Sequence, residues 1–189
     1  IEKQNIKVLR YATRIIDVSG KPISNEHYCV QYESSLKFFI KKLSGKARSS
    51  LSEYIFLSKQ VKSSLIDFPL AWYADDLLYL KASDFGTIYT INESKVGVRA
   101  SPFNISGDNL LNKKKNVASN LFFHHLLTKY KDRFSDKEIN LLINRLEKSV
   151  INNKTNLKLF SNLYQVYFKY GEFRRLVPFF KNAFKSIRF

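Results

Sequence analysis

The chain has 189 residues, of which 44% are hydrophobic and 15% aromatic, a composition that forms a core and excludes a disordered tail. Its 32 lysines and arginines against 16 acidic residues give a net charge of +16, which favours a polyanionic partner such as RNA, DNA or an acidic protein. No apolar run approaches the ~18 residues of a membrane span, so no membrane insertion is expected, and the single cysteine excludes an intrachain disulfide.

The first hundred residues, 1–100, are expected to form an N-terminal helical region. Apolar residues recur at helical spacing along residues 3–18, and the glycine and proline of SGKP at 19–22 end that segment. Further helices are expected over residues 24–44, 49–66 and 70–82.

The helical pattern breaks at TIYTINESKVGVRA, residues 87–100. Two β-favouring runs flank the polar NESK, which predicts a small β-hairpin. Residues 101–117 are polar, contain glycine and end in a lysine-rich stretch, so they are expected to form a linker or a surface loop.

Residues 118–189 are expected to form two basic helical hairpins, at 118–151 and 155–187. Ser135 and Glu138 have the spacing of a capping box, and Gly171 is placed to end a helix. The predicted fold class is therefore mainly α, with antiparallel helical hairpins in a short solenoid or bundle and one β-hairpin insertion.

The stretch YFKYGEFRRLVPFFKNAF, residues 167–184, resembles one unit of the tetratricopeptide repeat and of its RNA-binding relative, the pentatricopeptide repeat. The shared features include Gly171 at the turn between the helices and the small Ala183, while Pro178 departs from the pattern and is expected to kink the second helix. The resemblance implies a helical repeat in which Asn162 takes a base-contacting position. In the tetratricopeptide mode it implies a surface that binds a partner protein.

The C-terminal basic residues form a candidate nucleic-acid interface. The segment 173–189 contains no acidic residue, and its cations recur at a spacing that predicts a single stripe opposite the apolar face of the last helix. Such a stripe can follow successive phosphates. The predicted interface comprises Lys113, Lys114, Lys115, Asn162, Lys169, Arg174, Arg175, Lys181, Lys185 and Arg188.

Two patterns raise the question of catalysis. Asp75 and Asp76 belong to a Tyr-Ala-Asp-Asp tetrapeptide that resembles the metal-binding motif of reverse transcriptases, but the surrounding pattern predicts the exposed face of a helix. Asp84, Glu93 and Lys95 have the residue types of a metal-dependent nuclease. Glu93 and Lys95, however, fall in the predicted hairpin turn.

Other candidate groups are isolated. His124 and His125 are adjacent on a predicted helix and diverge, so no metal site and no cofactor are expected. Cys29 is surrounded by apolar and aromatic residues and is expected to be a buried structural thiol, in a reducing intracellular compartment such as the mitochondrion or the nucleus.

The function expected from the sequence is a non-catalytic, basic helical-repeat module that binds RNA through phosphate contacts, in an organellar or other ribonucleoprotein. DNA is the second nucleic-acid partner to consider. The alternatives are a protein-interaction adaptor within a larger complex and, after it, a metal-dependent nuclease.

Overall fold

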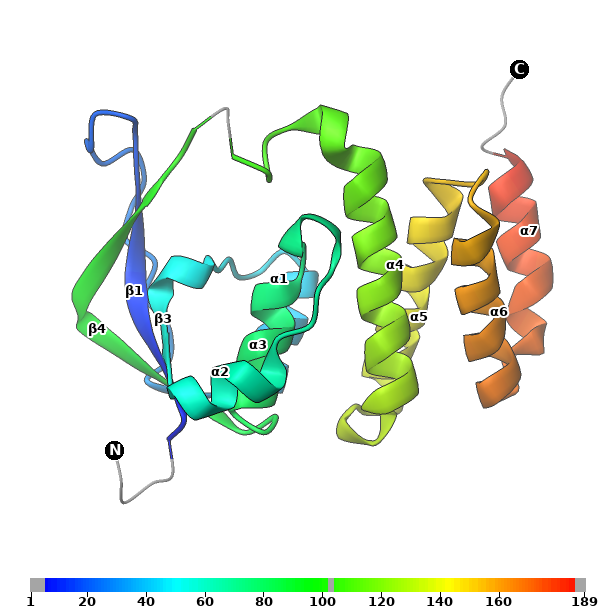
Figure 1. Ribbon diagram of the computed structural model, residues 1–189, viewed down its shortest axis with the longest axis horizontal. Helices are drawn as coiled ribbons and strands as arrows, with labels where there is room; N and C mark the ends of the chain where they lie inside the picture. Colours follow the sequence, from blue (N-terminus) through cyan, green and yellow to red (C-terminus); the bar gives the residue numbers. More distant parts are fainter. Residues whose placement is uncertain (1–5, 102–103, 186–189) are drawn as a thin grey trace. The chain divides into compact units, whose positions relative to one another are not determined.

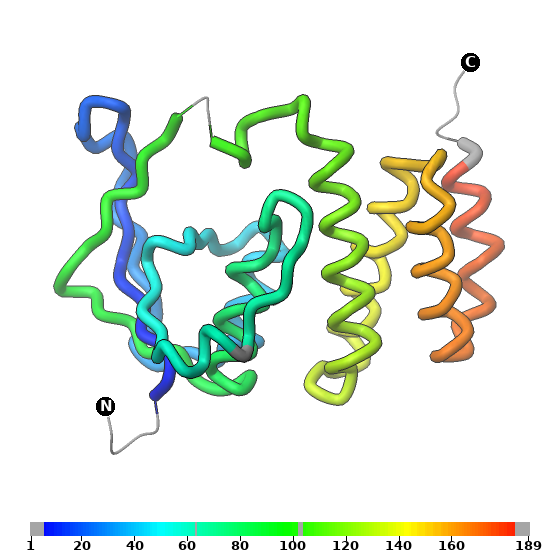
Figure 2. Tube along the Cα trace, viewed as in Figure 1, coloured from blue at the N-terminus to red at the C-terminus, as the bar shows by residue number. Residues whose placement is uncertain are grey.

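The computed structural model describes residues 6–101 and 104–185. The chain divides into two compact units, which Figures 1 and 2 show in the same view. The sheet unit comprises Ile1–Asp67 and Ala74–Asp108, and the helical unit comprises Phe68–Tyr73 and Asn109–Phe189. The chain therefore enters the helical unit for six residues, returns to the sheet unit and leaves it again.

The described part of the sheet unit contains one mixed sheet. Its strands are β1 (Val8–Ile16), β2 (Tyr32–Ser34), β3 (Tyr54–Phe56) and β4 (Thr87–Arg99), in the order β2-β4-β1-β3. The long central strands β1 and β4 are parallel, and the short edge strands are antiparallel to them. This mixed α/β fold contradicts the predicted mainly α fold, and the expectation of an all-α helical repeat is wrong.

Residues 87–100, predicted to form a β-hairpin, form the single strand β4. Tyr11 of β1 pairs with Ile91, and the next residue, Ala12, pairs with Lys95. The three residues between Ile91 and Lys95 therefore bulge out of the ladder. Both halves of β4 pair with β1 instead of with each other, so the predicted hairpin is wrong, and the first three residues of the polar NESK segment form a bulge.

The helix predicted over residues 3–18 is also wrong, because β1 occupies most of it. Val8, Arg10 and Ala12 are all fully buried, as alternate residues of a strand facing a core should be. A charged residue at the middle inward position hides this alternation from a hydrophobicity pattern.

Three helices accompany the sheet: α1 (Ser35–Leu43), α2 (Ser58–Ser64) and α3 (Ala74–Ala82). The Ser34 side chain caps α1 by accepting a hydrogen bond from the Lys37 N–H. Helices α1 and α3 meet the inner face of the sheet, where Phe38 lies 4.1 Å below the Arg10 guanidinium and Tyr79 stacks on Tyr54. The helix predicted over 24–44 is thus reduced to its second half, and the one predicted over 49–66 is divided between a 3₁₀ turn, β3 and α2.

The helical unit contains α4 (Asn112–Lys129), α5 (Asp136–Ile151), α6 (Leu157–Tyr170) and α7 (Leu176–Lys185), which lie side by side in this order (Figure 1). The predicted capping box of Ser135 and Glu138 at the start of α5 is confirmed, as is the left-handed Gly171 at the end of α6. Pro178 lies in the first turn of α7, where no helical hydrogen bond is lost, so the predicted kink has no cause. None of the helices described could span a membrane.

The short segment Phe68–Tyr73 belongs to the helical unit through its aromatic rings. Phe68 meets Phe122 of α4 edge to face, with ring centroids 5.9 Å apart, and Tyr73 stacks on Phe122 at 4.6 Å. The Trp72 ring lies 5.2 Å from the Lys115 ammonium group. These contacts explain why a segment surrounded in sequence by the sheet unit packs with α4.

Candidate functional site

The cations predicted to bind nucleic acid divide into exposed and engaged groups. Lys113 and Lys114 are exposed at the start of α4, and Lys169 is exposed at the end of α6. Arg174 and Lys181 are exposed as well, but only Lys181 lies on α7, because Arg174 belongs to a 3₁₀ turn that precedes the helix. The single stripe expected along one last helix is therefore wrong in this respect. The Lys185 side chain and the whole of Arg188 lie outside the described residues.

Arg175 is held by the helical unit itself. Its guanidinium forms ion pairs with Glu147 at 3.0 Å and Glu172 at 3.4 Å, and it donates hydrogen bonds to Asn140 and Asn144. These partners lie on α5 and at the end of α6, so Arg175 joins neighbouring helices. We assign it a structural role.

Lys115 and Asn162 are buried, each with 8% of its surface exposed. The Lys115 ammonium group lies over Trp72, as described above. The Asn162 amide donates a 2.7 Å hydrogen bond to Asn120, whose own amide donates to Ser149 and to the Leu159 carbonyl. Asn162 is thus a packing residue between helices, and the surface proposed below does not include it.

Exposed aromatic side chains accompany the exposed cations on the same elements. Tyr164 and Phe168 are one turn apart on α6 and both are exposed, and the half-exposed Phe173 meets Phe168 edge to face at 5.9 Å. Lys169 and Arg174 directly follow Phe168 and Phe173 in the chain. Aromatic rings beside cations are the features that single-stranded nucleic acids use for base stacking and phosphate contact.

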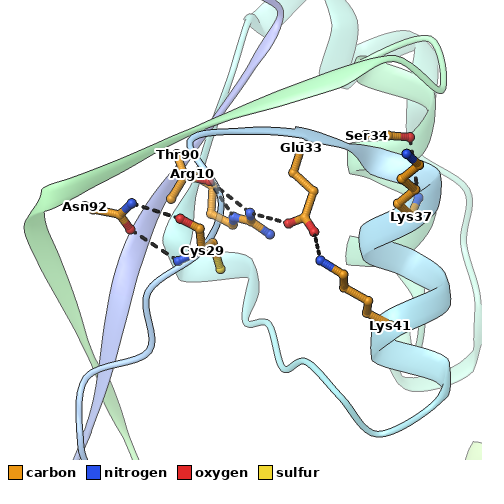
Figure 3. Close-up of polar contacts among 8 residues, drawn as sticks. All are labelled: Arg10, Cys29, Glu33, Ser34, Lys37, Lys41, Thr90 and Asn92. Carbon is orange, nitrogen blue, oxygen red and sulfur yellow. Dashed lines mark hydrogen bonds and ion pairs between the residues drawn. The ribbon is translucent and has the colours of Figure 1, made fainter.

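A second group of polar residues is buried in the sheet unit and is shown in Figure 3. Arg10 is fully buried and donates hydrogen bonds to Thr90 of β4 at 2.9 and 3.2 Å and to Glu33 at 3.0 Å. Glu33 also pairs with Lys41 of α1. Because Thr90 is the register partner of Arg10, the guanidinium links the two central strands and, through Glu33, α1.

Asp76, expected on an exposed helix face, is instead buried, with 1% of its surface exposed. It forms an ion pair with Lys42 at 2.8 Å and accepts a hydrogen bond from the Tyr79 hydroxyl at 2.9 Å. Burial raises the pKa of Asp76 to about 6, and Lys42 opposes that rise. Burial alone would lower the pKa of Lys42, but the carboxylates of Asp76 and Asp75 outweigh it and raise this pKa.

Glu53 is a second buried carboxyl of the sheet unit with a raised pKa. Burial raises its pKa to about 7, although it accepts a 3.0 Å hydrogen bond from the Ser50 N–H. Close to it, Arg10 Nη1, the Tyr54 hydroxyl and the Ser49 hydroxyl are buried and make no hydrogen bond within the described residues. Arg10 and Tyr54 are register partners on β1 and β3, so their unsatisfied donors face the same side of the sheet.

The buried charged groups of this network do not face a ligand in solution. Arg10, Glu53 and Asp76 are each at least 98% buried, and the raised pKa values of the Glu53 and Asp76 carboxyls follow from desolvation inside a folded core. The network can hold strands and helices together and can accommodate internal water at its unsatisfied donors. No single feature of the sequence indicated it, apart from charged residues at positions that alternate with buried apolar ones.

The nuclease-like residues are spread over exposed positions. Asp84 follows α3 with a positive φ of 52° and is exposed, and Glu93 is exposed in the bulge of β4. Lys95 pairs with Glu26 at 3.4 Å. In the described ranges, no group of three or more histidine, cysteine or acidic side chains is arranged to hold a metal ion.

The remaining titratable candidates make local contacts. His124 shares a 3.1 Å hydrogen bond with Gln165 of α6, and burial lowers its pKa. Cys29 is partly buried, and burial raises the pKa of its thiol, which disfavours the reactive thiolate. The Asn92 side chain pairs with both backbone groups of Cys29, which fixes the loop before β2 (Figure 3).

Comparison with protein-family models, curated proteins and solved structures finds no match for this chain. The resemblance of residues 167–184 to tetratricopeptide and pentatricopeptide repeats thus stays a prediction from the sequence.

Proposed function

We propose that the helical unit binds single-stranded RNA through its exposed lysines, arginines and aromatic rings. The observation that carries this proposal is the division of charge between the units. The helical unit has 17 basic and 5 acidic residues, a net charge of +12, whereas the sheet unit has 15 and 11, a net charge of +4. A polyanion is therefore attracted chiefly to the helical unit.

The few acidic residues of the helical unit do little to neutralise its exposed cations. Glu147 and Glu172 are paired with Arg175, and Glu138 is engaged in the capping box of α5. The exposed cations named above are not among the partners of these carboxylates. These carboxylates therefore leave the exposed charges uncompensated, and the charges can act on a ligand in solution, although the Lys169 ammonium group also donates a 2.9 Å hydrogen bond to the Thr128 carbonyl.

The exposed aromatic rings favour a single strand over a duplex. Tyr164 and Phe168 have 47% and 68% of their surface exposed and lie one turn apart on α6, so both rings are accessible to a ligand. Bases of a single strand can stack on such rings, whereas the bases of a duplex are stacked on each other. Lys169 and Arg174 are then placed to contact the adjoining phosphates.

The test is a binding titration of the full chain with single-stranded RNA and with duplex DNA at several salt concentrations. Contacts to six phosphates of a single strand would give a slope of about −4 in log affinity against log salt. Affinity would then fall about 300-fold between 50 and 200 mM salt. Absence of binding at 50 mM salt, or tighter binding to the duplex, would contradict the proposal.

The second candidate function is a protein-interaction adaptor, and an apolar groove in the helical unit supports it. The groove has a volume of about 340 Å³ and is lined by apolar residues of α5, α6 and α7 that include Val150, Phe160 and Phe179. A partner helix or peptide could bury these side chains. Binding of such a partner would depend little on salt, so the same titration separates the two functions.

A further inference from the structure

A small polar groove runs between α4 and α5, on residues that the predicted interface did not include. Polar residues of α5 recur at positions i, i+3, i+4 and i+7, and those of α4 at i and i+3. The groove has a volume of about 130 Å³. It is lined by Tyr73, Asn116, Ser119, Phe123, Arg145, Lys148, Ser149 and Asn152.

The charge of this groove has one sign. Arg145 and Lys148 are its charged lining residues, and none of the lining residues is acidic. The Lys148 side chain is exposed, and Arg145 is partly buried. A cationic groove without a carboxylate in its wall favours an anionic ligand over a cation or a neutral one.

The hydrogen-bonding capacity of the wall is also suited to an anion. The Asn152 amide donates to the Asn116 side-chain oxygen at 3.4 Å, which leaves the Asn116 NH₂ group as a donor. Ser149 already donates to the Leu146 carbonyl and accepts from Asn120, so it serves as a fixed part of the floor. Lys148 and Asn116 supply donors, and the Arg145 guanidinium, which already has a partner within the protein, carries five N–H groups, more than one partner uses. The oxygens of a phosphoryl group could accept from all three residues.

The groove is supported by rigid packing. Ser149 connects its floor to the buried hydrogen-bond network of Asn120 and Asn162, which links α4, α5 and α6. On the other side, Tyr73 stacks on the buried Phe122 with the two rings nearly parallel. The two helices that carry the donors are thereby held together without a ligand, as a preformed groove requires.

The groove is small, and its size restricts the ligand. Sites for drug-sized molecules generally have volumes of about 300–1,000 Å³. A volume of about 130 Å³ suits a single phosphoryl group and excludes a complete nucleotide. The rest of such a ligand would have to lie outside the groove.

We propose that this groove binds one phosphoryl group through Arg145, Lys148 and Asn116. The inference rests on the proposed function, because the helical unit's RNA ligand would supply that group. It can be a phosphodiester of the RNA backbone or a terminal phosphomonoester, because both present non-bridging phosphoryl oxygens that accept hydrogen bonds.

The direct test uses inorganic phosphate and pyrophosphate as probes with the full ¹⁵N-labelled chain. Saturable shifts of the side-chain amide signals of Asn116 and Asn152 are expected, and they should disappear in the Arg145→Ala, Lys148→Ala double variant. The control double variant Lys137→Ala, Lys158→Ala removes two exposed charges from α5 and α6 and should retain the shifts. Equal shifts in both double variants would mean an adventitious ion only and would overturn the proposal.

The source of the phosphoryl group is distinguished with RNA oligonucleotides carrying a 5′-phosphate or a 5′-hydroxyl. If the terminal monoester is bound, the phosphorylated oligonucleotide should bind about ten-fold tighter, and this difference should vanish in the Arg145→Ala, Lys148→Ala variant. If a backbone phosphodiester is bound, the Arg145→Ala, Lys148→Ala variant should bind both oligonucleotides more weakly, and by the same factor. The slope of log affinity against log salt should then become shallower, its magnitude decreasing by about 0.7.

Failure of this inference can be told apart from failure of the proposed function. RNA binding that is insensitive to the double variant but weakened by Arg174→Ala overturns the groove and supports the function. Phosphate shifts without RNA binding support the groove and overturn the function. Because Lys148 is exposed, Lys148→Ala alone provides a folded variant if substitution of Arg145 destabilises the chain.

Discussion

Arg10 contributes to the fold through the geometry of its guanidinium group. Three of its hydrogen bonds reach Thr90 and Glu33, and its planar face lies over Phe38. A single buried side chain therefore contacts β4 through Thr90, β2 through Glu33 and α1 through Phe38. Buried charge pairs add little stability compared with apolar residues, but removal of one partner leaves the other uncompensated.

The substitution Glu33→Leu should lower the free energy of unfolding by about 3–5 kcal/mol, because Arg10 would keep its buried charge without a counter-charge. The double variant Arg10→Met, Glu33→Leu should be more stable than Glu33→Leu alone. Urea unfolding followed by circular dichroism measures both. The matched control is Glu26→Leu, which breaks the more exposed ion pairs with Arg14 and Lys95 and should cost less than about 1 kcal/mol. Equal losses for Glu33→Leu and Glu26→Leu would contradict the assigned role of Arg10.

Glu53 should make stability depend on pH. Its pKa rises from 4.5 to about 7 in the folded chain, so between these values the folded state binds a proton that the unfolded state has lost. Stability should therefore decrease as pH rises from 4.5 to 7. The variant Glu53→Gln keeps an acceptor for the Ser50 N–H and should be more stable than the unsubstituted chain at pH 8, by roughly 1–3 kcal/mol.

The gain from Glu53→Gln should disappear at pH 4.5, where the carboxyl of the folded chain is protonated. Urea unfolding at the two pH values supplies the comparison. Asp76 also titrates in this range but is present in both proteins, so its contribution cancels in the difference. An equal gain at both pH values would mean that Glu53 is not the group responsible.

At the scale of elements, sequence patterns predicted the helices of the helical unit better than the strands of the sheet unit. A capping box marks the start of helix α5, and a glycine marks the end of α6. Both signals come from residues close together in the sequence. The alternation of apolar and polar residues in strand β1 is interrupted because Arg10 occupies an inward position. The hydrogen-bond partners that allow Arg10 to be buried, Glu33 and Thr90, lie far away in the chain. No local pattern can show that a charge has such partners.

The turn at Gly171 allows a prediction about one element. Gly171 has a φ of 67°, and a Cβ atom added there would meet nothing within 4 Å. Gly171→Ala should therefore cost about 1–2 kcal/mol through backbone strain alone. The control is Gly107→Ala, where the nearest atom is 3.7 Å away and φ is not positive, and its effect should be within about 0.5 kcal/mol. Thermal unfolding of both variants measures the difference, and equal stability would show that the end of α6 adapts.

At the scale of the whole molecule, the sequence predicted the charge of the candidate site better than its residues. The concentration of basic residues in the C-terminal part follows from counting alone. Which cations are exposed depends on packing: Lys115 lies over Trp72, and Arg175 is surrounded by carboxylates and amides. The groove between α4 and α5 could have been found from polar residues at helical spacing on each helix, but only the pairing of the helices brings them together.

The division of charge leads to a prediction for the whole chain. The variant Arg174→Ala, Lys181→Ala removes two exposed charges from the helical unit. The slope of log affinity for single-stranded RNA against log salt should then decrease in magnitude by about 1.4. The matched variant Lys21→Ala, Lys46→Ala removes two exposed charges from the sheet unit and should leave the slope unchanged. Fluorescence anisotropy with a labelled oligonucleotide measures both. Equal changes would indicate that the two units share the binding or that it is non-specific.

Because Phe68–Tyr73 belongs to the helical unit, the two units cannot be separated by a single cut in the chain. A recombinant fragment ending at Asp108 would keep these six residues but lose α4, the helix that covers their rings. Its complement, beginning at Asn109, would lack the aromatic side chains that shield Phe122. Both fragments would then expose apolar surface to water and tend to aggregate. The roles of the two units are therefore better tested by substitution than by truncation.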